Sequence, residues 1–167
     1  YTNIENEFND FEKEILLPFK QSTLGPSITS GDVNNDNLED ILIGGSKGQA
    51  AQLFIQNNNK YKKKLNRVFL EDANYEDMES IFIDIDNDND QDLYIVSGGN
   101  EFNQRSESLK DRIYINDGNG NFSRSTQPEI PDYTISGKTV SKIDFDKDGD
   151  QDLIVGNRIV TQKYPLH

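Results

Sequence analysis

The chain has 167 residues, no cysteine and a formal net charge of −13. This charge argues against nucleic acid and anionic membrane surfaces as partners, because clustered Lys and Arg drive such binding. Without cysteine, disulfides and thiolate chemistry are excluded. Hydrophobic residues make up only 33% of the chain, which predicts a thin or layered core. No apolar run approaches the roughly 20 residues that span a bilayer, so no membrane insertion is expected.

Residues 1–24 precede the regular part of the sequence and are expected to be a lead-in or the tail of a preceding unit. Phe8, Phe11 and Ile15 are spaced loosely enough for a short helix or an extended strand. Pro18 ends either structure.

An acidic nine-residue pattern occurs three times, at residues 32–40, 84–92 and 144–152, which we call the first, second and third Asp loops. Oxygen-bearing side chains occupy positions 1, 3, 5 and 9 of every copy. A short apolar run typical of a β-strand follows each copy directly. The loops therefore predict a repeated unit in which a polar loop leads into a strand.

The expected strands follow from these runs and from turn-forming Gly and Asn residues. In the first unit, residues 25–78, they lie at 27–31, 40–44, 51–56 and 61–65. In the second unit, residues 79–138, they lie at 79–83, 92–96, 112–115 and 121–125. In the third unit, residues 139–167, they lie at 139–143 and 153–156, with a further strand near 157–161.

The spacing of the Asp loops, 52 residues from Asp32 to Asp84 and then 60 to Asp144, is close to the period of propeller repeats. With four strands in a unit, the sequence predicts an all-β fold, a partial β-propeller of about two and a half to three four-stranded antiparallel blades. Because propellers usually close with about four to eight blades, a longer protein is expected to supply the remaining ones.

The Asp loops have the side chains that calcium prefers, because this hard cation takes about six to eight oxygen ligands. Alternate side chains of a tight loop converge on one point. Position 7 offers its backbone carbonyl, and the Asp side chain at position 9 completes the coordination shell of the ion. Without cysteine and with one histidine at the chain end, a soft-metal site is excluded, and magnesium prefers a smaller octahedral shell. We expect up to three Ca²⁺ ions, one per loop. The candidate ligands are Asp32, Asn34, Asp36, Leu38, Asp40, Asp84, Asp86, Asp88, Asp90, Asp92, Asp144, Asp146, Asp148, Asp150 and Asp152.

Two other interpretations of the Asp loops are an EF-hand and a polar turn without a metal. An EF-hand needs a bidentate Glu at position 12, whereas these loops have Ile43, Ile95 and Val155 there, each inside an apolar run. The loops could instead be polar turns without a metal. Three copies with one set of ligand positions favour calcium, and strong destabilisation is expected without it.

Residues 31–44, 84–96 and 144–156 resemble FG-GAP/VCBS repeats, the β-propeller repeats of integrin α-subunits and many bacterial surface proteins. Residues 53–55 and 113–122 resemble the third strand and turn of that family. The resemblance implies calcium in the Asp loops, a secreted, cell-surface or periplasmic location, and a binding or adhesion scaffold. The first Asp loop has Asn34 where the others have Asp, and is expected to bind calcium more weakly.

The second unit departs from the repeat at residues 97–110, an insert between its second and third strands. Antiparallel strands place this insert at the end opposite the Asp loops, which is the ligand face of integrin-like propellers. A protein or glycan ligand is therefore expected near Asn100, Glu101, Phe102, Asn103 and Arg105, although a surface loop without function stays an alternative.

No catalytic residue is predicted, because the sequence offers no cysteine, no usable histidine and no nucleophile elbow. The alternative from another class is a calcium-assisted polysaccharide lyase, in which Tyr94, Arg112 or Tyr133 would serve as acid–base groups. A purely architectural propeller that positions another domain is a third possibility.

Overall fold

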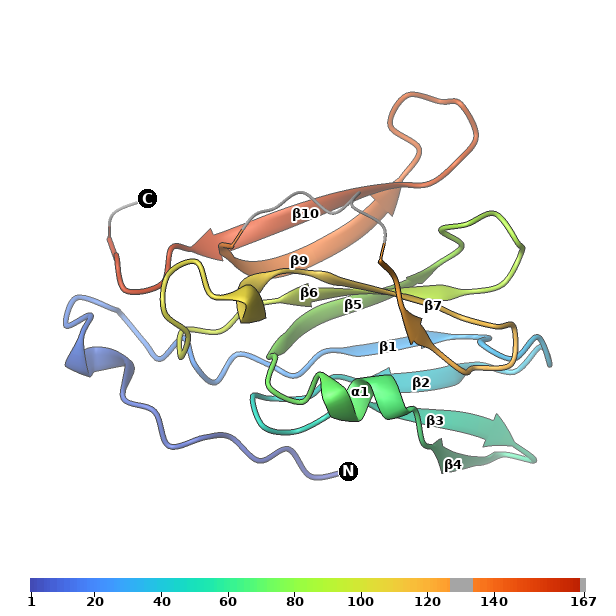
Figure 1. Cartoon of the computed structure of the whole chain (residues 1–167), viewed down its shortest axis with the longest axis horizontal. Coiled ribbons are helices and arrows are strands. Elements are labelled where there is room, and N and C mark those ends of the chain that lie inside the picture. Colours follow the sequence, from blue (N-terminus) through green and yellow to red (C-terminus); the bar gives the residue numbers. More distant parts are fainter. Residues whose placement is uncertain (127–133, 166–167) are drawn as a thin grey trace.

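The computed structural model describes residues 1–126 and 134–165. Within these ranges the chain is all-β, with three antiparallel sheets and three short helices. Figure 1 shows the sheets following one another through the molecule in sequence order. The expected all-β class is confirmed.

The sheets contain four, four and two strands in the order of the chain. The first sheet consists of β1 (Ile28–Gly31), β2 (Asp40–Ile43), β3 (Gln52–Asn57) and β4 (Lys60–Lys64). The second consists of β5 (Asp77–Ile83), β6 (Asp92–Ser97), β7 (Arg112–Ile115) and β8 (Ser123–Arg124). The third pairs β9 (Ser136–Ile143) with β10 (Asp152–Ile159).

Each Asp loop joins the first two strands of its sheet in the same register. The residue before the loop pairs with the Asp at position 9, in the pairs Gly31–Asp40, Ile83–Asp92 and Ile143–Asp152. Position 9 therefore begins the second strand in all three units, and the expected order of strand, Asp loop and strand is confirmed.

The core lies in two layers, and β6 contributes to both. Because successive side chains of a strand point to opposite faces, Leu93 and Ile95 enter the layer between the first two sheets. Tyr94 and Val96 enter the layer between the second and third sheets. Since β6 is buried along its whole length, its sequence is a continuous apolar run rather than an alternating one.

The helices are η1 (Asp10–Glu12), α1 (Arg67–Glu71) and η2 (Glu107–Leu109). Helix α1 was not expected from the sequence, since five residues are too few to form a helix on their own. Its Phe69 is buried and packs edge-on against Tyr114, with ring centroids 5.3 Å apart. Tertiary packing therefore stabilises α1.

Two strand predictions need correction. The fourth strand of the second unit is limited to β8, because the Phe122 amide donates to Asn66 Oδ1 (2.9 Å) rather than to a neighbouring strand. The separate strand expected near residues 157–161 is wrong, because β10 continues to Ile159 and stays paired with β9 through bulges after Gly156. In the lead-in, only η1 forms regular structure.

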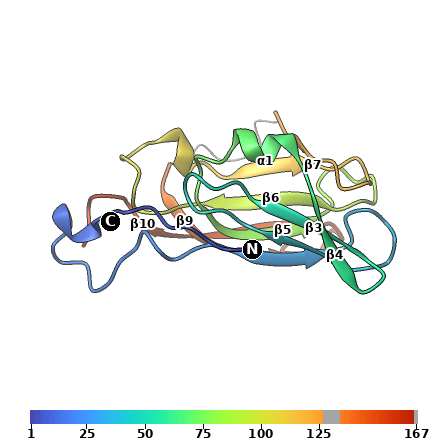
Figure 2. The same ribbon diagram turned by 90° about the horizontal axis from the view of Figure 1, so that it is seen from below.

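The molecule has two distinct ends, visible in Figures 1 and 2. The three Asp loops lie together at one end, and the insert at residues 97–110 lies with η1 at the other. Within the described ranges, no helix has the length and apolar character needed to cross a membrane.

Candidate metal centres

The three Asp loops share a backbone feature, because positions 4 and 6 are left-handed in every copy. The φ angles are 58° and 64° at Asn35 and Asn37, 63° and 70° at Asn87 and Asn89, and 65° and 101° at Lys147 and Gly149. Asn and Gly tolerate this region better than other residues do. These paired turns curl each loop, and Asn or Gly at position 6 of all three copies was a sequence signal for them.

The Asp at position 9 fastens each loop internally. One carboxylate oxygen accepts the backbone N–H of position 2, at 3.1 Å from Asp40 to Val33 N, 2.9 Å from Asp92 to Ile85 N and 2.7 Å from Asp152 to Phe145 N. The same contact in three separate copies marks it as part of the repeat.

In the first two units, position 9 also fastens the loop to the end of the third strand. The second oxygen of Asp40 accepts Gln56 N at 2.8 Å, and that of Asp92 accepts Asn116 N at 2.8 Å. Both carboxylates are fully buried. Their role as candidate metal ligands is therefore combined with a structural role as hydrogen-bond acceptors.

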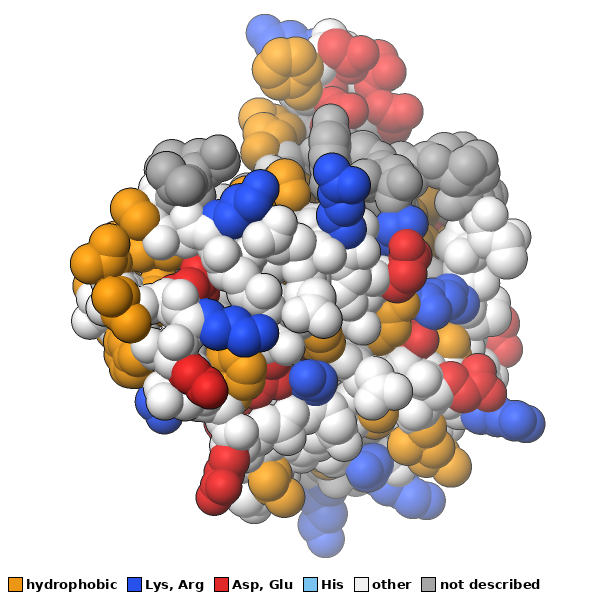
Figure 3. All heavy atoms as spheres, turned by 60° about the vertical axis from the view of Figure 1, so that its left-hand side comes forward, with side chains coloured by type: hydrophobic (Ala, Val, Ile, Leu, Met, Phe, Trp, Pro, Cys, Tyr) orange, Lys and Arg blue, Asp and Glu red, His pale blue; other side chains and the backbone are white. Residues whose placement is uncertain are grey.

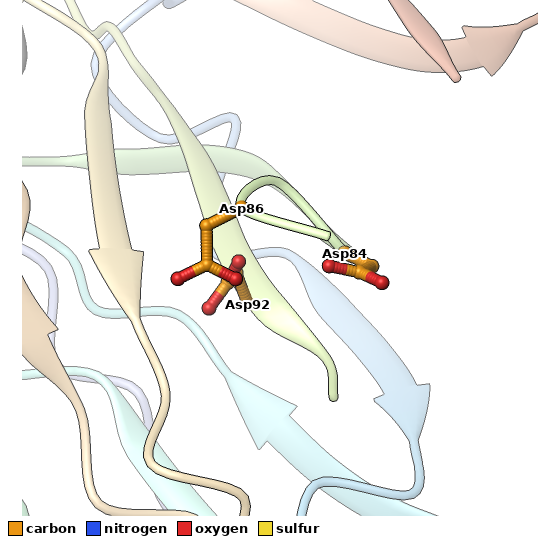
Figure 4. Close-up of side chains that lie close together, drawn as sticks. All are labelled: Asp84, Asp86 and Asp92. Carbon is orange, nitrogen blue, oxygen red and sulfur yellow. The ribbon is translucent and has the colours of Figure 1, made fainter. Parts of the chain in front are cut away.

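The second Asp loop brings three carboxylates together. Asp84, Asp86 and Asp92 each place one oxygen within 4.8 Å of the others, and Figure 4 shows Asp86 beside Asp92 with Asp84 across the loop. Burial raises the pKa of Asp92 above its ordinary value, although backbone hydrogen bonds from Asn116 and Ile85 oppose the rise. A cation at this point would offset the charge that burial disfavours.

The third Asp loop forms two such groups within the same limit. One consists of Asp144, Asp146 and Asp152, and the other of Asp146, Asp148 and Asp150. Most of this loop is exposed to solvent, unlike the second loop. Its carboxylates could hold a hard cation through oxygen ligands alone.

The first Asp loop differs at position 3. Among the described residues, no group of three acids gathers there within the same limit. The Asn34 amide occupies the position instead, and its Nδ2 donates to Asp36 Oδ2 at 3.0 Å. Asp32 accepts the backbone N–H groups of Asp36 and Asn37, at 3.1 and 2.7 Å, which shapes the loop without a third carboxylate.

The side chains at position 7 have different surroundings, as expected if only the backbone carbonyl is required there. Leu38 and Asp150 are exposed, whereas Asp90 is buried. Burial, together with the carboxylates of the same loop, raises the pKa of Asp90 to about 6. Asp90 Oδ1 has no hydrogen-bond partner among the described residues.

The turn at residues 116–120 occupies the space between the first two Asp loops, a role that the sequence did not reveal. Asn116 Nδ2 donates to Val33 O at 2.9 Å, and Gly120 lies against the Val33 side chain. Between the second and third loops, the corresponding space is a cleft of about 390 Å³. It is lined by Ile83, Asp84, Ile85, Asn87, Ile113, Gly149, Asp150, Gln151, Asp152 and Leu153.

The five candidate ligand-face residues do not form one exposed group. Asn103 and Arg105 are exposed, whereas Asn100 and Phe102 are buried. Asn100 Nδ2 donates to Asp10 Oδ1 (3.0 Å) and Glu14 Oε2 (2.7 Å) of the lead-in. The Glu101 side chain is only 3% exposed and pairs with Lys47 at 3.7 Å. Figure 3 shows this end, where charged and hydrophobic side chains are mixed.

Two of the three candidate acid–base groups of the lyase alternative, Tyr94 and Arg112, are held inside the protein. Tyr94 is buried, and its hydroxyl donates to Asp111 Oδ2 at 2.7 Å. Arg112 is also buried and forms an ion pair with Asp77. Tyr133 lies outside the described residues.

A further acidic group, outside the Asp loops and not revealed by the sequence, surrounds Glu76 at the opposite end of the molecule. Glu76 is 1% exposed, and its Oε1 has no hydrogen-bond partner among the described residues. Burial raises the pKa of Glu76 to about 8, with smaller contributions from nearby carboxylates, of which Glu101 and Glu5 are the largest. The Glu76 carboxyl is therefore mostly protonated at neutral pH.

Comparison with known proteins gives one assignment. Residues 32–95 and 84–155 each match the FG-GAP-like repeat, so the matched part extends from the first Asp loop to β10. No curated protein and no solved structure matches the chain. Because the two matches together cover well over half of the sequence, and each begins at an Asp loop, the chain belongs to the FG-GAP-like repeat family.

Proposed function

We propose that this chain is a calcium-stabilised β-propeller-type unit that acts as an extracellular binding or adhesion scaffold. The observation that carries the proposal is the recurrence of one Asp-loop geometry in three units, at one end of the molecule. A loop that served a single reaction would have no reason to recur in each sheet. A metal in every loop would hold together the first two strands of each sheet, where the core is thin.

The carboxylates support calcium as the metal. The second and third loops gather acidic oxygens within 4.8 Å, which fits a hard cation with oxygen ligands. The first loop has one carboxylate fewer at Asn34 and would be the weakest site. Each site would take a carboxylate oxygen from position 1 of its loop, which is Asp32, Asp84 or Asp144. The other candidate ligands of the same loop would complete the site.

The packing of the sheets supports the propeller-type arrangement. The first strands of neighbouring sheets lie together, with β1 against β5 and β5 against β9. Ile28 on the first sheet and Ile154 on the third are 71% and 54% exposed. Further blades of the same type would cover such outward-facing side chains. We therefore propose that blades from the rest of a longer protein are partners of this chain.

The two ends suggest a division of roles. The Asp loops at one end would hold the scaffold together, whereas the opposite end, which bears the insert at residues 97–110, would contact a protein or glycan ligand. The role is non-enzymatic in this proposal, which agrees with the internal contacts of Tyr94 and Arg112.

Calorimetric titration with calcium tests the metal half of the proposal. Wild type is expected to take up calcium, and Asp86→Ala and Asp146→Ala are each expected to lose one site. Gln151→Ala is the matched control, because Gln151 is exposed in the third loop and is not a candidate ligand. Absence of calcium uptake, or equal uptake by both Asp variants and wild type, would contradict the assignment.

A glycan array probed in calcium and in EDTA tests the ligand half. Binding in calcium that disappears in EDTA supports a calcium-dependent scaffold for glycans. Release of unsaturated sugar products, detected by ultraviolet absorbance, would contradict a non-enzymatic role and support the lyase alternative.

A further inference from the structure

Residues 1–6, which we call the strap, lie extended against the end of the molecule opposite the Asp loops. They form no helix or strand. The Gln49 side chain contacts the strap backbone at two points, since its Oε1 accepts Ile4 N at 3.0 Å and its Nε2 donates to Thr2 O at 2.9 Å. One amide side chain thus reproduces the pair of hydrogen bonds that a neighbouring strand would make.

The side chains of the strap alternate as in an extended peptide. Tyr1, Asn3 and Glu5 face the protein: the Tyr1 hydroxyl donates to Gly44 O at 2.8 Å, and the Ser46 hydroxyl lies 2.9 Å from both Asn3 Oδ1 and Glu5 Oε1. The Ile4 side chain between them is 69% exposed. Within residues 1–5, the side-chain contacts therefore come from alternate positions, as in peptides bound at a sheet edge.

The surface under the strap also reaches the second unit. Asn6 Nδ2 donates to Glu101 Oε2 at 3.2 Å, and Lys47 holds the same carboxylate at 3.7 Å. Glu101 belongs to the insert that departs from the repeat. The surface thus combines the turn after β2 with that insert, and we call Gly44, Ser46, Gln49 and Glu101 the strap site.

The strap site is held in place by bonds that do not involve the strap. Gly45 N donates to Asp77 Oδ2 at 2.8 Å, Gly48 N donates to Ala73 O at 2.7 Å, and Gln49 N donates to Ser46 O at 2.8 Å. Preorganised surfaces bind with a smaller entropic cost. The site is therefore expected to keep its shape when the strap leaves.

We propose that the strap site is a binding site for extended peptides, and that residues 1–6 are its intramolecular occupant. The external ligand is an extended peptide with a hydroxyphenyl, an amide and a carboxylate side chain at alternate positions. A peptide fits better than a glycan, because the two contacts from Gln49 recognise a backbone N–H and C=O. The inference rests on the proposed binding role and names the ligand class for that face.

The strap competes with any external peptide at a high effective concentration, in the millimolar range for short linkages. Wild type should therefore bind such a peptide weakly. The chain with Asn3→Ala and Glu5→Ala, which we call the released chain, should bind it more tightly, because the strap has lost its contacts with Ser46.

The probe is an acetylated peptide of residues 1–6 with a fluorophore at its carboxyl end, followed by fluorescence anisotropy in calcium. The released chain is expected to bind at least about tenfold more tightly than wild type. Adding Gln49→Ala to the released chain is expected to abolish this gain. Gln104→Ala is the matched control, because Gln104 is exposed at the same end of the molecule and makes none of the strap contacts.

Two further measurements make the result decisive. A scrambled peptide that exchanges the inward and outward positions should not bind, and calcium-dependent thermal stabilisation, measured on the same samples, shows that each variant is folded. No binding to a released chain that calcium still stabilises would overturn the peptide inference and leave the scaffold role standing. Equal binding with Gln49→Ala, or with the scrambled peptide, would also overturn it. Loss of calcium stabilisation in wild type would instead reject the proposed function.

Discussion

Replacement of Asp92 by Ala removes the carboxylate that holds the second Asp loop through its hydrogen bonds. The buried carboxylate accepts Ile85 N at 2.9 Å and Asn116 N at 2.8 Å, and the substitution leaves both N–H groups without these acceptors. Each buried donor that loses its partner costs about 1–3 kcal/mol. The variant no longer has to bury a carboxylate, which is itself unfavourable, and this offsets part of the loss. We expect a decrease of about 2–4 kcal/mol in the free energy of unfolding without calcium.

The assay is equilibrium urea unfolding, followed by circular dichroism in EDTA and in saturating calcium. Asp88→Ala is the control, since Asp88 is exposed and, among the described residues, its side chain accepts only Asp90 N, at 3.0 Å. It should cost less than about 1 kcal/mol in EDTA. In calcium, both variants should lose additional stability, because each removes a side chain that would coordinate the ion. Calcium that binds the folded state alone adds to its stability. If Asp92→Ala costs no more than Asp88→Ala in EDTA, the fastening role assigned to position 9 is wrong.

Three further predictions concern other parts of the structure. Because the pKa of Glu76 is raised, the folded state holds a proton that the unfolded state loses. Urea titrations should therefore show the free energy of unfolding falling between about pH 4.5 and 8, by at most about 1.4 kcal/mol per pH unit. Glu76→Gln should flatten this slope. Arg112→Met leaves Asp77 buried without its cation and should cost about 3–5 kcal/mol in denaturant unfolding, whereas the exposed Arg67→Met should change little. Asn34→Asp should strengthen calcium binding at the first loop in calorimetry; unchanged binding would show that charge at position 3 does not limit it.

The Asp loops and most strands could be predicted because their signals are local. Oxygen-bearing side chains at fixed positions and the apolar runs after them depend on neighbouring residues alone. The same locality made position 9 recognisable as a closing residue. Its contact with Asn116 was not predictable, because the two residues meet only when the third strand returns to the loop end.

The features that the sequence did not reveal depend on contacts between distant segments. Helix α1 forms because Phe69 enters a core built from two sheets. The burial of Asn100 and Phe102 depends on how the lead-in and the insert fold against each other, which no periodicity reports. Glu76 resembles any exposed acid in sequence, and only the fold surrounds it with other carboxylates.

Thermal unfolding in EDTA and at increasing calcium concentration is the most direct test of the central claim, that the Asp loops are metal sites that stabilise the repeat. We predict that the midpoint rises steadily with calcium and rises less with magnesium at equal concentration, since binding to the folded state alone stabilises it. A midpoint that is the same in EDTA and in saturating calcium would contradict the claim.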